Sequence, residues 1–280
     1  MMLSEFDMDK LRMMLDEDLG DGDVTTESII SENDLGVGNV VVTEPGFIFG
    51  CSMVEFLFNE MGVVFDSGVE DGDRVSSDEV VGVVEGSVRD ILMGERVALN
   101  LLCHLSGVAT ATKEMIDIVR DVNADVDVAA TRKTTPLLRS FEKKAVKAVG
   151  GEPHRKNLGD FVLIKDNHLR YVESISKAVE MARAGGSKKI EIEVENCVEA
   201  LEAVYAGADI VMLDNFSPKE VSKTVGVIEE NGLLDEVVIE VSGGIEPSNI
   251  GSYAIKGVDL ISSSYMTMKA PALDIKLDLI

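Results

Sequence analysis

Basic side chains, cysteines and long apolar runs are all scarce in this sequence, and it has no tryptophan. Its 280 residues carry 26 Lys plus Arg against 51 Asp plus Glu, a formal net charge of −25 with a pI near 4.4. This charge argues against broad electrostatic binding to nucleic acid or to an anionic membrane. No apolar run approaches the ~18 residues of a spanning helix, and residues 1–7 lack the basic and apolar regions of a secretion signal. We therefore expect a cytoplasmic protein with neither nucleic acid nor a membrane as partner.

Only three cysteines are present, at Cys51, Cys103 and Cys197. They are too far apart for a zinc site or a disulfide framework, and their odd number fits a reducing compartment. The rest of the composition is that of a globular protein, since 45% of the residues are hydrophobic and can bury a core. We expect three partly buried thiols in a chain of one or two domains.

The hydrophobic pattern changes near residue 107. Before it, helical stretches at 6–16 and 90–104 flank short Val-rich strands at 40–43, 47–50, 63–66 and 79–84. After it, apolar β-branched runs at 126–130, 161–164, 190–194, 210–213, 237–241 and 260–261 alternate with helical segments at 137–148, 173–184, 198–206, 218–230 and 247–255. Repeated strand–helix units predict a parallel sheet, and about six of them can close into a barrel.

We therefore predict an α/β protein in which residues 1–107 form an N-terminal domain and residues 108–269 form an α/β barrel domain. The last segment, 270–280, alternates like an edge strand, and we expect it to return to the first domain.

Each predicted strand after residue 107 ends in polar or small residues. These clusters are Thr131–Thr134, Lys165–His168, Glu193 with Glu195, Asp214-Asn215, Ser242–Gly244 and Ser262–Ser264. In α/β barrels and open sheets, the carboxyl ends of the strands form the rim of the active site. The six clusters therefore predict one shared site.

The charge distribution indicates what this site binds. Between residues 131 and 170 there are ten basic and four acidic side chains, a net charge of +6 inside a protein of −25. Arg132, Lys133 and Lys165 directly follow apolar strands, whereas the lysines at 143, 144 and 147 fit the solvated face of a helix. A cationic pocket in an anionic protein indicates a multiply anionic small ligand, with phosphates or carboxylates.

Three acidic residues, Glu191, Glu193 and Glu195, alternate along one predicted strand and so share a face. Acidic groups there are costly unless they meet a cation or hydroxyl groups, so they could coordinate magnesium through water or bind a ribose diol. For Glu191 alone we expect ordinary exposure at the beginning of the strand.

Two further loops carry weaker signals. The Ser242-Gly243-Gly244 turn precedes a helix start, a pattern that fits either a plain turn or a phosphate seat. The acidic stretch 18–26 lacks the ligand order of a calcium loop, and we interpret it as a structural loop.

These motifs together resemble the quinolinate phosphoribosyltransferase family, also called nicotinate-nucleotide pyrophosphorylase (carboxylating). The resemblance rests on residues 131–136, 142–143, 154–155, 164–168, 213–216 and 240–245, and it extends to 20–26, 94–96, 105–107 and 270–274. It implies an N-terminal α/β sandwich domain, an α/β barrel of six or seven strands, and a homodimer, or a multiple of dimers, with shared active sites. It also implies a reaction in which quinolinate and phosphoribosyl pyrophosphate, with Mg²⁺, give nicotinate mononucleotide, pyrophosphate and CO₂ in NAD biosynthesis.

The same resemblance implies roles for individual residues. The two carboxylates of quinolinate would be clamped by Arg132, His154, Arg155 and Lys165, beside Thr131. Arg96 would be lent to the site across the dimer. Lys133 would face the pyrophosphate, and the catalytic set would be Lys133, Lys165, Glu193 and Asp214. Glu193 and Asp214 would hold the ribose hydroxyls and the environment of the metal. The 5′-phosphate would be seated by Ser242, Gly243, Ser263 and Ser264. No set of protein residues is assigned as direct metal ligands.

The sequence departs from the family pattern at a few positions. Leu137 stands where the family has a glycine after proline, and Val149 and Pro153 replace a glycine and an asparagine ahead of the His-Arg pair. The family's Thr-His-Ser run is replaced by Thr267-Met268-Lys269, which makes Lys269 a candidate replacement cation, and Ser264 replaces the usual glycine.

Two alternatives stay open on the sequence alone. One is the molybdenum-associated paralogue of unknown substrate, whose group differs around the Lys165–His168 motif. The other is a non-catalytic binder of phosphorylated anions on an inherited barrel. The presence of Glu193, Asp214, Lys133 and Lys165 argues against the binder, because a protein that only binds would not need all four.

Overall fold

The computed structural model describes residues 3–280, which form two compact units. Of the described residues, unit 1 comprises 3–113, 135–150 and 269–280, and unit 2 comprises 114–134 and 151–268. The boundary that the sequence suggested at residue 107 lies within the helix α4 (Val88–Val122). The division therefore falls a few residues later than the hydrophobic pattern indicated, and the segment 135–150 groups with the N-terminal part of the chain.

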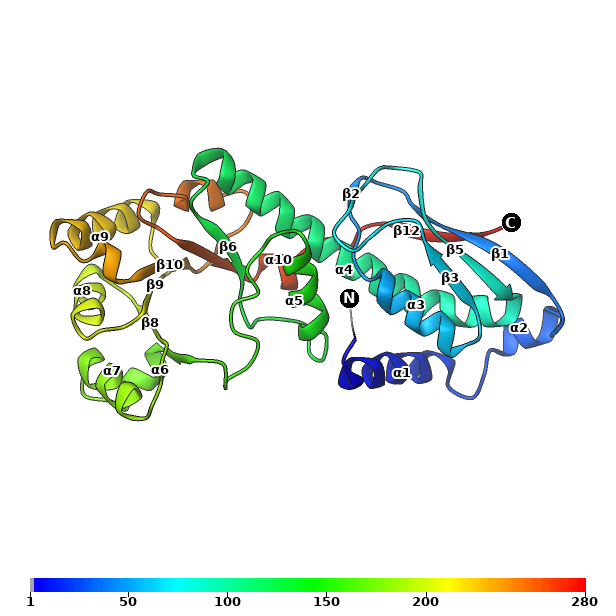
Figure 1. Cartoon of the computed structure of the whole chain (residues 1–280), viewed down its shortest axis with the longest axis horizontal. Helices are drawn as coiled ribbons and strands as arrows, with labels where there is room; N and C mark the ends of the chain where they lie inside the picture. The colour runs from blue at the N-terminus through cyan, green and yellow to red at the C-terminus, as the bar shows by residue number, and fades with distance from the viewer. Residues whose placement is uncertain (1–2) are drawn as a thin grey trace. The chain divides into compact units, whose positions relative to one another are not determined.

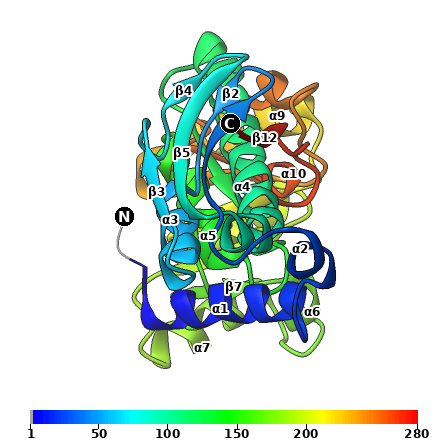
Figure 2. The ribbon, with the colours of Figure 1, turned by 90° about the vertical axis from the view of Figure 1, so that its right-hand side faces the viewer.

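Unit 1 is built on a four-stranded antiparallel sheet with the order β12-β1-β5-β3. These strands are β1 (Leu35–Val42), β3 (Val64–Ser67), β5 (Glu79–Ser87) and β12 (Ile275–Leu279). A small pair, β2 (Gly46–Phe47) with β4 (Arg74–Val75), lies beside it. The helices are α1 (Glu5–Leu19), α2 (Val24–Ile29), α3 (Cys51–Glu60), the first part of α4, and α5 (Arg139–Ala148). The helices α3 and α4 lie along one face of the sheet (Figures 1 and 2). Their apolar side chains form the core together with those of the strands.

The chain end belongs to this sheet. β12 pairs antiparallel with β1, with Val40 opposite Leu277 and Val42 opposite Ile275. The return passes close to α4, where a side chain on Gly107 would meet the backbone of Pro271 and Ala272. Gly107 therefore stands inside a helix because two backbones approach there, and it does not end the helix.

The helix α4 is the main correction in unit 1, because the sequence predicted that it ends at residue 104. Apolar side chains continue at helical spacing as far as Val119 and are buried, among them Leu105, Val108, Met115 and Ile116. Among the described residues, α4 is the one helix long and apolar enough to cross a membrane by length and composition, although 61% of its apolar window is buried inside the protein. The burial is that of a helix in the core of the protein.

Other differences in unit 1 have local causes. The helix α3 was not predicted. The acidic stretch read as a loop contains the start of α2, because Asp23 caps that helix by accepting hydrogen bonds from the N–H groups of Thr25 and Thr26 at 3.0 Å. The three cysteines are free thiols, one buried and two half-buried, which confirms that prediction.

Unit 2 contains a six-stranded parallel sheet with the order β6-β11-β10-β9-β8-β7. Its strands are β6 (Asp127–Ala130), β7 (Val162–Ile164), β8 (Ile190–Val194), β9 (Ile210–Asp214), β10 (Val238–Ser242) and β11 (Leu260–Ser263). α7 (Ile175–Ala184), α8 (Cys197–Tyr205) and α9 (Pro218–Glu230) lie side by side along the strands (Figure 1). The short elements are α6 (Asp166–Leu169), η1 (Leu234–Glu236), η2 (Ile250–Tyr253) and α10 (Tyr265–Met268).

The sheet of unit 2 fits the predicted α/β barrel, and unit 1 fits the predicted N-terminal α/β domain. Within the described residues, β6 and β7, at the two edges of the sheet, are not paired with each other. At the β6 edge, Ala129 of β6 forms an isolated parallel bridge with Glu152. The helix predicted at 247–255 is wrong in extent, since only a 3₁₀ turn, η2, forms there.

A buried charge cluster anchors α5 to α1. Asp7 is 4% exposed, and its carboxylate lies 2.9 Å from Lys10 Nζ and 2.8 Å from Lys144 Nζ. Burial alone would raise the pKa of Asp7, but the hydrogen bonds from Lys144, Lys10 and Ser140 outweigh it and hold that pKa well below its usual range. The prediction that Lys143 and Lys144 lie on a solvated helix face is therefore wrong, because Lys143 is buried and Lys144 pairs with Asp7.

We predict that Asp7→Asn lowers the free energy of unfolding by roughly 3 kcal/mol at neutral pH, because it leaves the buried ammonium of Lys10 and the partly buried ammonium of Lys144 without their counter-charge. Since the folded-state pKa of Asp7 is depressed, this stabilisation is present above the ordinary pKa of 3.8 and is lost as the pH falls through the lower folded value. Urea unfolding at several pH values measures it. Asp9→Asn is the matched control, because Asp9 is 60% exposed and pairs with Arg12 on the surface. Equal losses in the two variants would contradict the prediction.

Candidate active site

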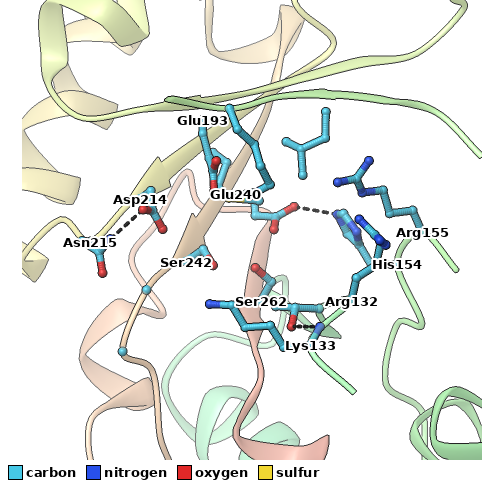
Figure 3. Close-up of a pocket in the computed structure, with 16 residues that line it drawn as sticks. Arg132, Lys133, His154, Arg155, Glu193, Asp214, Asn215, Glu240, Ser242 and Ser262 are labelled. Atoms are coloured by element: carbon cyan, nitrogen blue, oxygen red, sulfur yellow. Dashed lines mark hydrogen bonds and ion pairs between the residues drawn. The ribbon is translucent and has the colours of Figure 1, made fainter. Parts of the chain in front are cut away.

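The strand-end clusters meet in one pocket of about 370 Å³ in unit 2 (Figure 3). Ten of the site residues predicted from the sequence line it: Thr131, Arg132, Lys133, His154, Arg155, Lys165, Glu193, Asp214, Ser242 and Gly243. The remaining lining residues are Leu163, Met212, Asn215, Glu240, Gly244 and Ser262. The pocket thus combines five cationic or protonatable basic side chains with three carboxylates.

Three predicted site residues lie elsewhere. Arg96 belongs to unit 1, on α4, where its side chain is 62% exposed and lies 3.7 Å from Glu95. Ser263 is buried and its hydroxyl donates to the carbonyl of Ile245 at 2.6 Å. Ser264 starts the turn of α10, where its carbonyl accepts from the N–H of Met268 at 2.9 Å.

Strand alternation explains why Ser262 lines the pocket in place of Ser263. Neighbouring residues of a strand point to opposite faces, so only one of Ser262 and Ser263 can face the pocket from β11. The sequence included Ser262 in the strand-end cluster, but the resemblance assigned the role to its neighbour.

The lysine of the 165–168 motif is positioned by the histidine of the same motif. The N–H of Lys165 donates to His168 Nδ1 at 2.8 Å, which caps the short helix α6. The Lys165 side chain then reaches Glu193 at the end of the neighbouring strand β8, with Nζ 2.6 Å from Oε1. The motif therefore fixes a cation next to a carboxylate at the ends of β7 and β8.

A second carboxylate, Asp214, lies at the end of β9 and accepts a hydrogen bond from Asn215 Nδ2 at 2.6 Å. Burial raises the pKa of Asp214, the charge of Glu193 adds to this, and Lys165 and Lys133 oppose it. Asn215 has a left-handed backbone with φ 59°, and its N–H donates to the carbonyl of Ser242 at 2.9 Å. A side chain at Gly243 would come within 2.7 Å of Asn215 N, so the glycine is required for this close approach.

The cationic side of the pocket is held by short-range contacts. Thr131 Oγ1 accepts from the N–H of Lys133 at 3.1 Å, and the Lys133 carbonyl accepts from Thr267 Oγ1 at 2.7 Å. Arg155 is only 6% exposed, and burial together with the charge of Arg132 lowers its pKa. Two guanidinium groups close enough to repel each other are favourable only when an anion lies between or beside them.

His154 is enclosed by two buried carboxylates that the sequence analysis did not predict to lie beside it. Its Nε2 lies 3.1 Å from Glu240 Oε2 and 3.3 Å from Glu191 Oε2, and both glutamates are fully buried. The expectation that Glu191 is exposed is wrong, because β8 is covered on both faces. Glu240 lies two residues before Ser242 on β10, so the alternation of that strand could have pointed to it.

The charges of the two glutamates decide the titration of His154. Burial alone would lower the pKa of the imidazole, but the hydrogen bonds and charges of Glu191 and Glu240 outweigh it and raise that pKa to about 9. Burial raises the pKa of Glu191 as well, and the neighbouring Glu240 adds to this while His154 and Arg155 oppose it. The raised pKa keeps the imidazole of His154 protonated at neutral pH.

Comparisons with known proteins address the whole chain. Residues 108–278 match the model of the quinolinate phosphoribosyl transferase C-terminal domain, and residues 23–106 match that of the N-terminal domain. The chain belongs to the quinolinate phosphoribosyltransferase family.

Individual relatives are similar over nearly their full length. A "Probable nicotinate-nucleotide pyrophosphorylase (carboxylating)" of Methanothermobacter thermautotrophicus is 43% identical over 97% of this chain and 98% of its own. The human nicotinate-nucleotide pyrophosphorylase (carboxylating) is 36% identical over 84% of this chain and 79% of its own. The crystal structure of NadC from Streptococcus pyogenes superposes with a TM-score of 0.92 at 36% identity, covering 100% of this chain and 99% of that one.

One departure from the pattern of this family has a visible structural consequence. Leu137, which stands in place of the family glycine, has a left-handed backbone with φ 66° and a side chain that is 67% exposed. Its carbonyl accepts a hydrogen bond from Lys10 Nζ at 3.2 Å, which holds the turn in place. A leucine in this conformation is strained, because its Cβ crowds the following carbonyl.

We predict that Leu137→Gly stabilises the protein by up to about 1 kcal/mol, since relief of the left-handed strain exceeds the entropy gained by the unfolded chain. Thermal and urea unfolding measure the change. The neighbouring Leu138→Gly is the control, because Leu138 has an ordinary φ of −88° and its replacement should destabilise. A loss of stability in Leu137→Gly as large as in Leu138→Gly would show that the strain is absent.

Proposed function

We propose that this protein transfers the phosphoribosyl group of phosphoribosyl pyrophosphate to the ring nitrogen of quinolinate, with release of pyrophosphate and CO₂, to give nicotinate mononucleotide for NAD synthesis. The observation that carries the proposal is the pocket itself. It places Arg132, Arg155 and Lys165 within one small volume that also contains Glu193 and Asp214. Family membership supports the same reaction, and it favours neither the molybdenum-associated paralogue nor a protein that only binds.

The cationic wall suits a planar ring with two carboxylates. Arg132, Arg155 and Lys165 line the pocket and supply N–H donors of the kind that carboxylates accept, and the buried Arg155 lies where water screens its charge little. Clamping both carboxylates also orients the ring nitrogen toward the sugar. We expect most of the rate acceleration to come from this positioning.

The carboxylates suit the sugar. As the bond from the anomeric carbon to pyrophosphate breaks, positive charge develops on the ribose ring, and Glu193 and Asp214 stabilise it from the opposite side of the pocket. Lys133 is placed to neutralise the leaving pyrophosphate. The ring nitrogen then holds the new bond as a pyridinium, an electron sink from which the adjacent carboxylate leaves as CO₂ and is replaced by a proton.

Mg²⁺ is part of the proposal, and the residues present fit it. Burial raises the pKa of Asp214 and the charge of Glu193 adds to this, and a nearby divalent cation would favour the ionised carboxylate. Mg²⁺ prefers to bind through one or two carboxylates together with substrate phosphates. When bound, it would supply charge neutralisation for the pyrophosphate. We therefore propose Glu193 and Asp214 as the protein groups that face it.

We also propose a homodimer, or a multiple of dimers, in which Arg96 of one subunit completes the site of another. The support is the family relationship together with the exposed side chain of Arg96 on unit 1. The 5′-phosphate is assigned to Ser242 and Gly243 at the end of β10, with Ser262 in place of the serines at 263 and 264. The cytoplasmic location and the absence of nucleic acid and membrane partners stay predictions.

We predict that the purified protein converts quinolinate, phosphoribosyl pyrophosphate and Mg²⁺ into nicotinate mononucleotide and CO₂ in equal amounts. Chromatography of the nucleotide and release of labelled CO₂ measure the two products. Lys133→Ala should lower kcat by roughly 10²-fold or more, because it removes the positive charge that stabilises the leaving pyrophosphate. Turnover of nicotinate without turnover of quinolinate would move the assignment to a different reaction.

We predict that Arg96→Ala abolishes activity without changing the fold, and that mixing it with inactive Lys133→Ala restores part of the activity. The reason is that a mixed dimer contains one site with both native residues. Activity is measured after the subunits have been exchanged by mild denaturation and refolding, with circular dichroism as the check on folding. If subunits demonstrably exchange and no activity returns, the sites are not shared.

A further inference from the structure

The two buried glutamates around His154 are not explained by the substrate contacts described above. Glu191 comes from β8 and Glu240 from β10, and both side chains meet the same ring nitrogen of His154. Figure 3 shows the contact between Glu240 and His154. Both carboxylates are fully buried, and among the described residues Glu191 Oε1 and Glu240 Oε1 have no hydrogen-bond partner. Two buried carboxylates of this kind are costly, so they must be compensated by a charge that the fold keeps beside them.

The charged groups around the ring come from several elements. β8 contributes Glu191, β10 contributes Glu240, and the segment of His154 itself contributes Arg155, whose charge acts on Glu191. Arg132, at the end of β6, acts on Arg155 in turn. Phe161 packs edge-on against the imidazole, with ring centroids 5.4 Å apart, and so fixes the plane of the ring.

The same three residues have the composition of a metal site, since their ligand atoms lie within 4.8 Å of one another. The surroundings favour a proton over a metal ion. Arg155 already acts on this cluster, and a divalent cation would add two positive charges where one imidazolium suffices. The distance of 3.1 Å from Nε2 to Glu240 lies within the usual range of an N–H···O hydrogen bond.

We propose that Glu240, assisted by Glu191, is a positioning residue that keeps His154 in its imidazolium form, so that the pocket wall presents a fixed positive charge and a second N–H donor to the dicarboxylate substrate. This inference rests on the proposed function, because it concerns the substrate of that reaction.

The argument follows from the donor inventory of the ring. With Nε2–H engaged by Glu240, a neutral imidazole would leave Nδ1 as a lone-pair acceptor, and a carboxylate can only accept. The imidazolium instead carries N–H groups on both nitrogens, so it can bind Glu240 and a substrate carboxylate at once. Glu240 therefore decides whether His154 attracts or repels the substrate.

The direct test is an NMR titration of the imidazole signals without substrate, which is practical because the chain has only three histidines. His154→Gln assigns the signal. The proposal predicts that His154 titrates near pH 9 in the wild type and that Glu240→Gln moves its midpoint down toward the ordinary histidine value of about 6.5. Glu230→Gln is the charge-matched control, since it removes one negative charge at the exposed end of α9 and should leave the midpoint unchanged.

The kinetic test uses the quinolinate KM as a function of pH. In Glu240→Gln, we expect KM to match the wild type near pH ~6 and to rise about 25-fold by pH ~8, as a midpoint near 6.5 requires when only the imidazolium binds, with kcat less affected. In the wild type and in Glu230→Gln, the KM profile should stay flat over that range. A merely structural role of Glu240 would raise KM equally at every pH.

Three results would overturn the inference. They are a His154 midpoint near 6.5 in the wild type, a midpoint that Glu240→Gln does not move, and a stoichiometric metal ion that is lost in His154→Gln.

Should Glu240→Gln fail to fold, the His154 midpoints of the wild type and of Glu191→Gln still test the inference. If the wild type makes no product from quinolinate, the proposed function fails while the NMR titration still reports on the cluster. If product forms and the Glu240→Gln profile parallels the wild type, only this inference fails.

Discussion

The parallel register of the six strands in unit 2 is the constraint on which the site depends. Ser242 pairs with Asp214, and Glu193 pairs with Met212 two residues earlier along β9. Because all these strands run in the same direction, their last residues arrive at one edge of the sheet. A carboxylate from β8, a carboxylate from β9 and a small residue from β10 therefore lie beside one another although more than 20 residues separate each from the next.

Charge balance is the second constraint, and it differs between the surface and the pocket. The protein as a whole is strongly acidic, yet the pocket holds Arg132, Lys133, Arg155 and Lys165. In a narrow and partly desolvated volume such cations repel one another, and the fold compensates with Glu193, Asp214 and the buried pair Glu191 and Glu240. The carboxylates thus have a structural role in holding the cationic wall together, besides any role toward the sugar.

Much of this arrangement was readable from the sequence. The bounds of β8 and α9 were predicted as the structure has them, because both segments have a clear period and α9 starts with a Ser-Pro capping signal. The family resemblance, confirmed by the family models, named ten residues that line the pocket. Strand ends are favourable for such reasoning, since a polar residue directly after an apolar run marks a definite place in a parallel sheet.

The errors have a shared physical cause, which is that tertiary contacts override local pattern. Glu191 was expected to be exposed because an acidic residue at a strand start usually is, and only the position of His154 on a distant segment makes its burial possible. Lys144 of α5 was assigned to solvent because Asp7, more than 130 residues earlier, is invisible to local periodicity. The helix α4 was predicted to end at residue 104, whereas it continues through Gly107, whose small size serves a backbone contact with Pro271.

The most direct test of the central claim is a crystal structure of the protein with quinolinate bound. The account predicts density for the ring inside the unit 2 pocket, with its two carboxylates against Arg132, Arg155 and Lys165 and its nitrogen directed toward Glu193 and Asp214. Quinolinate bound at another surface, or a pocket that stays empty at saturating ligand, would contradict it.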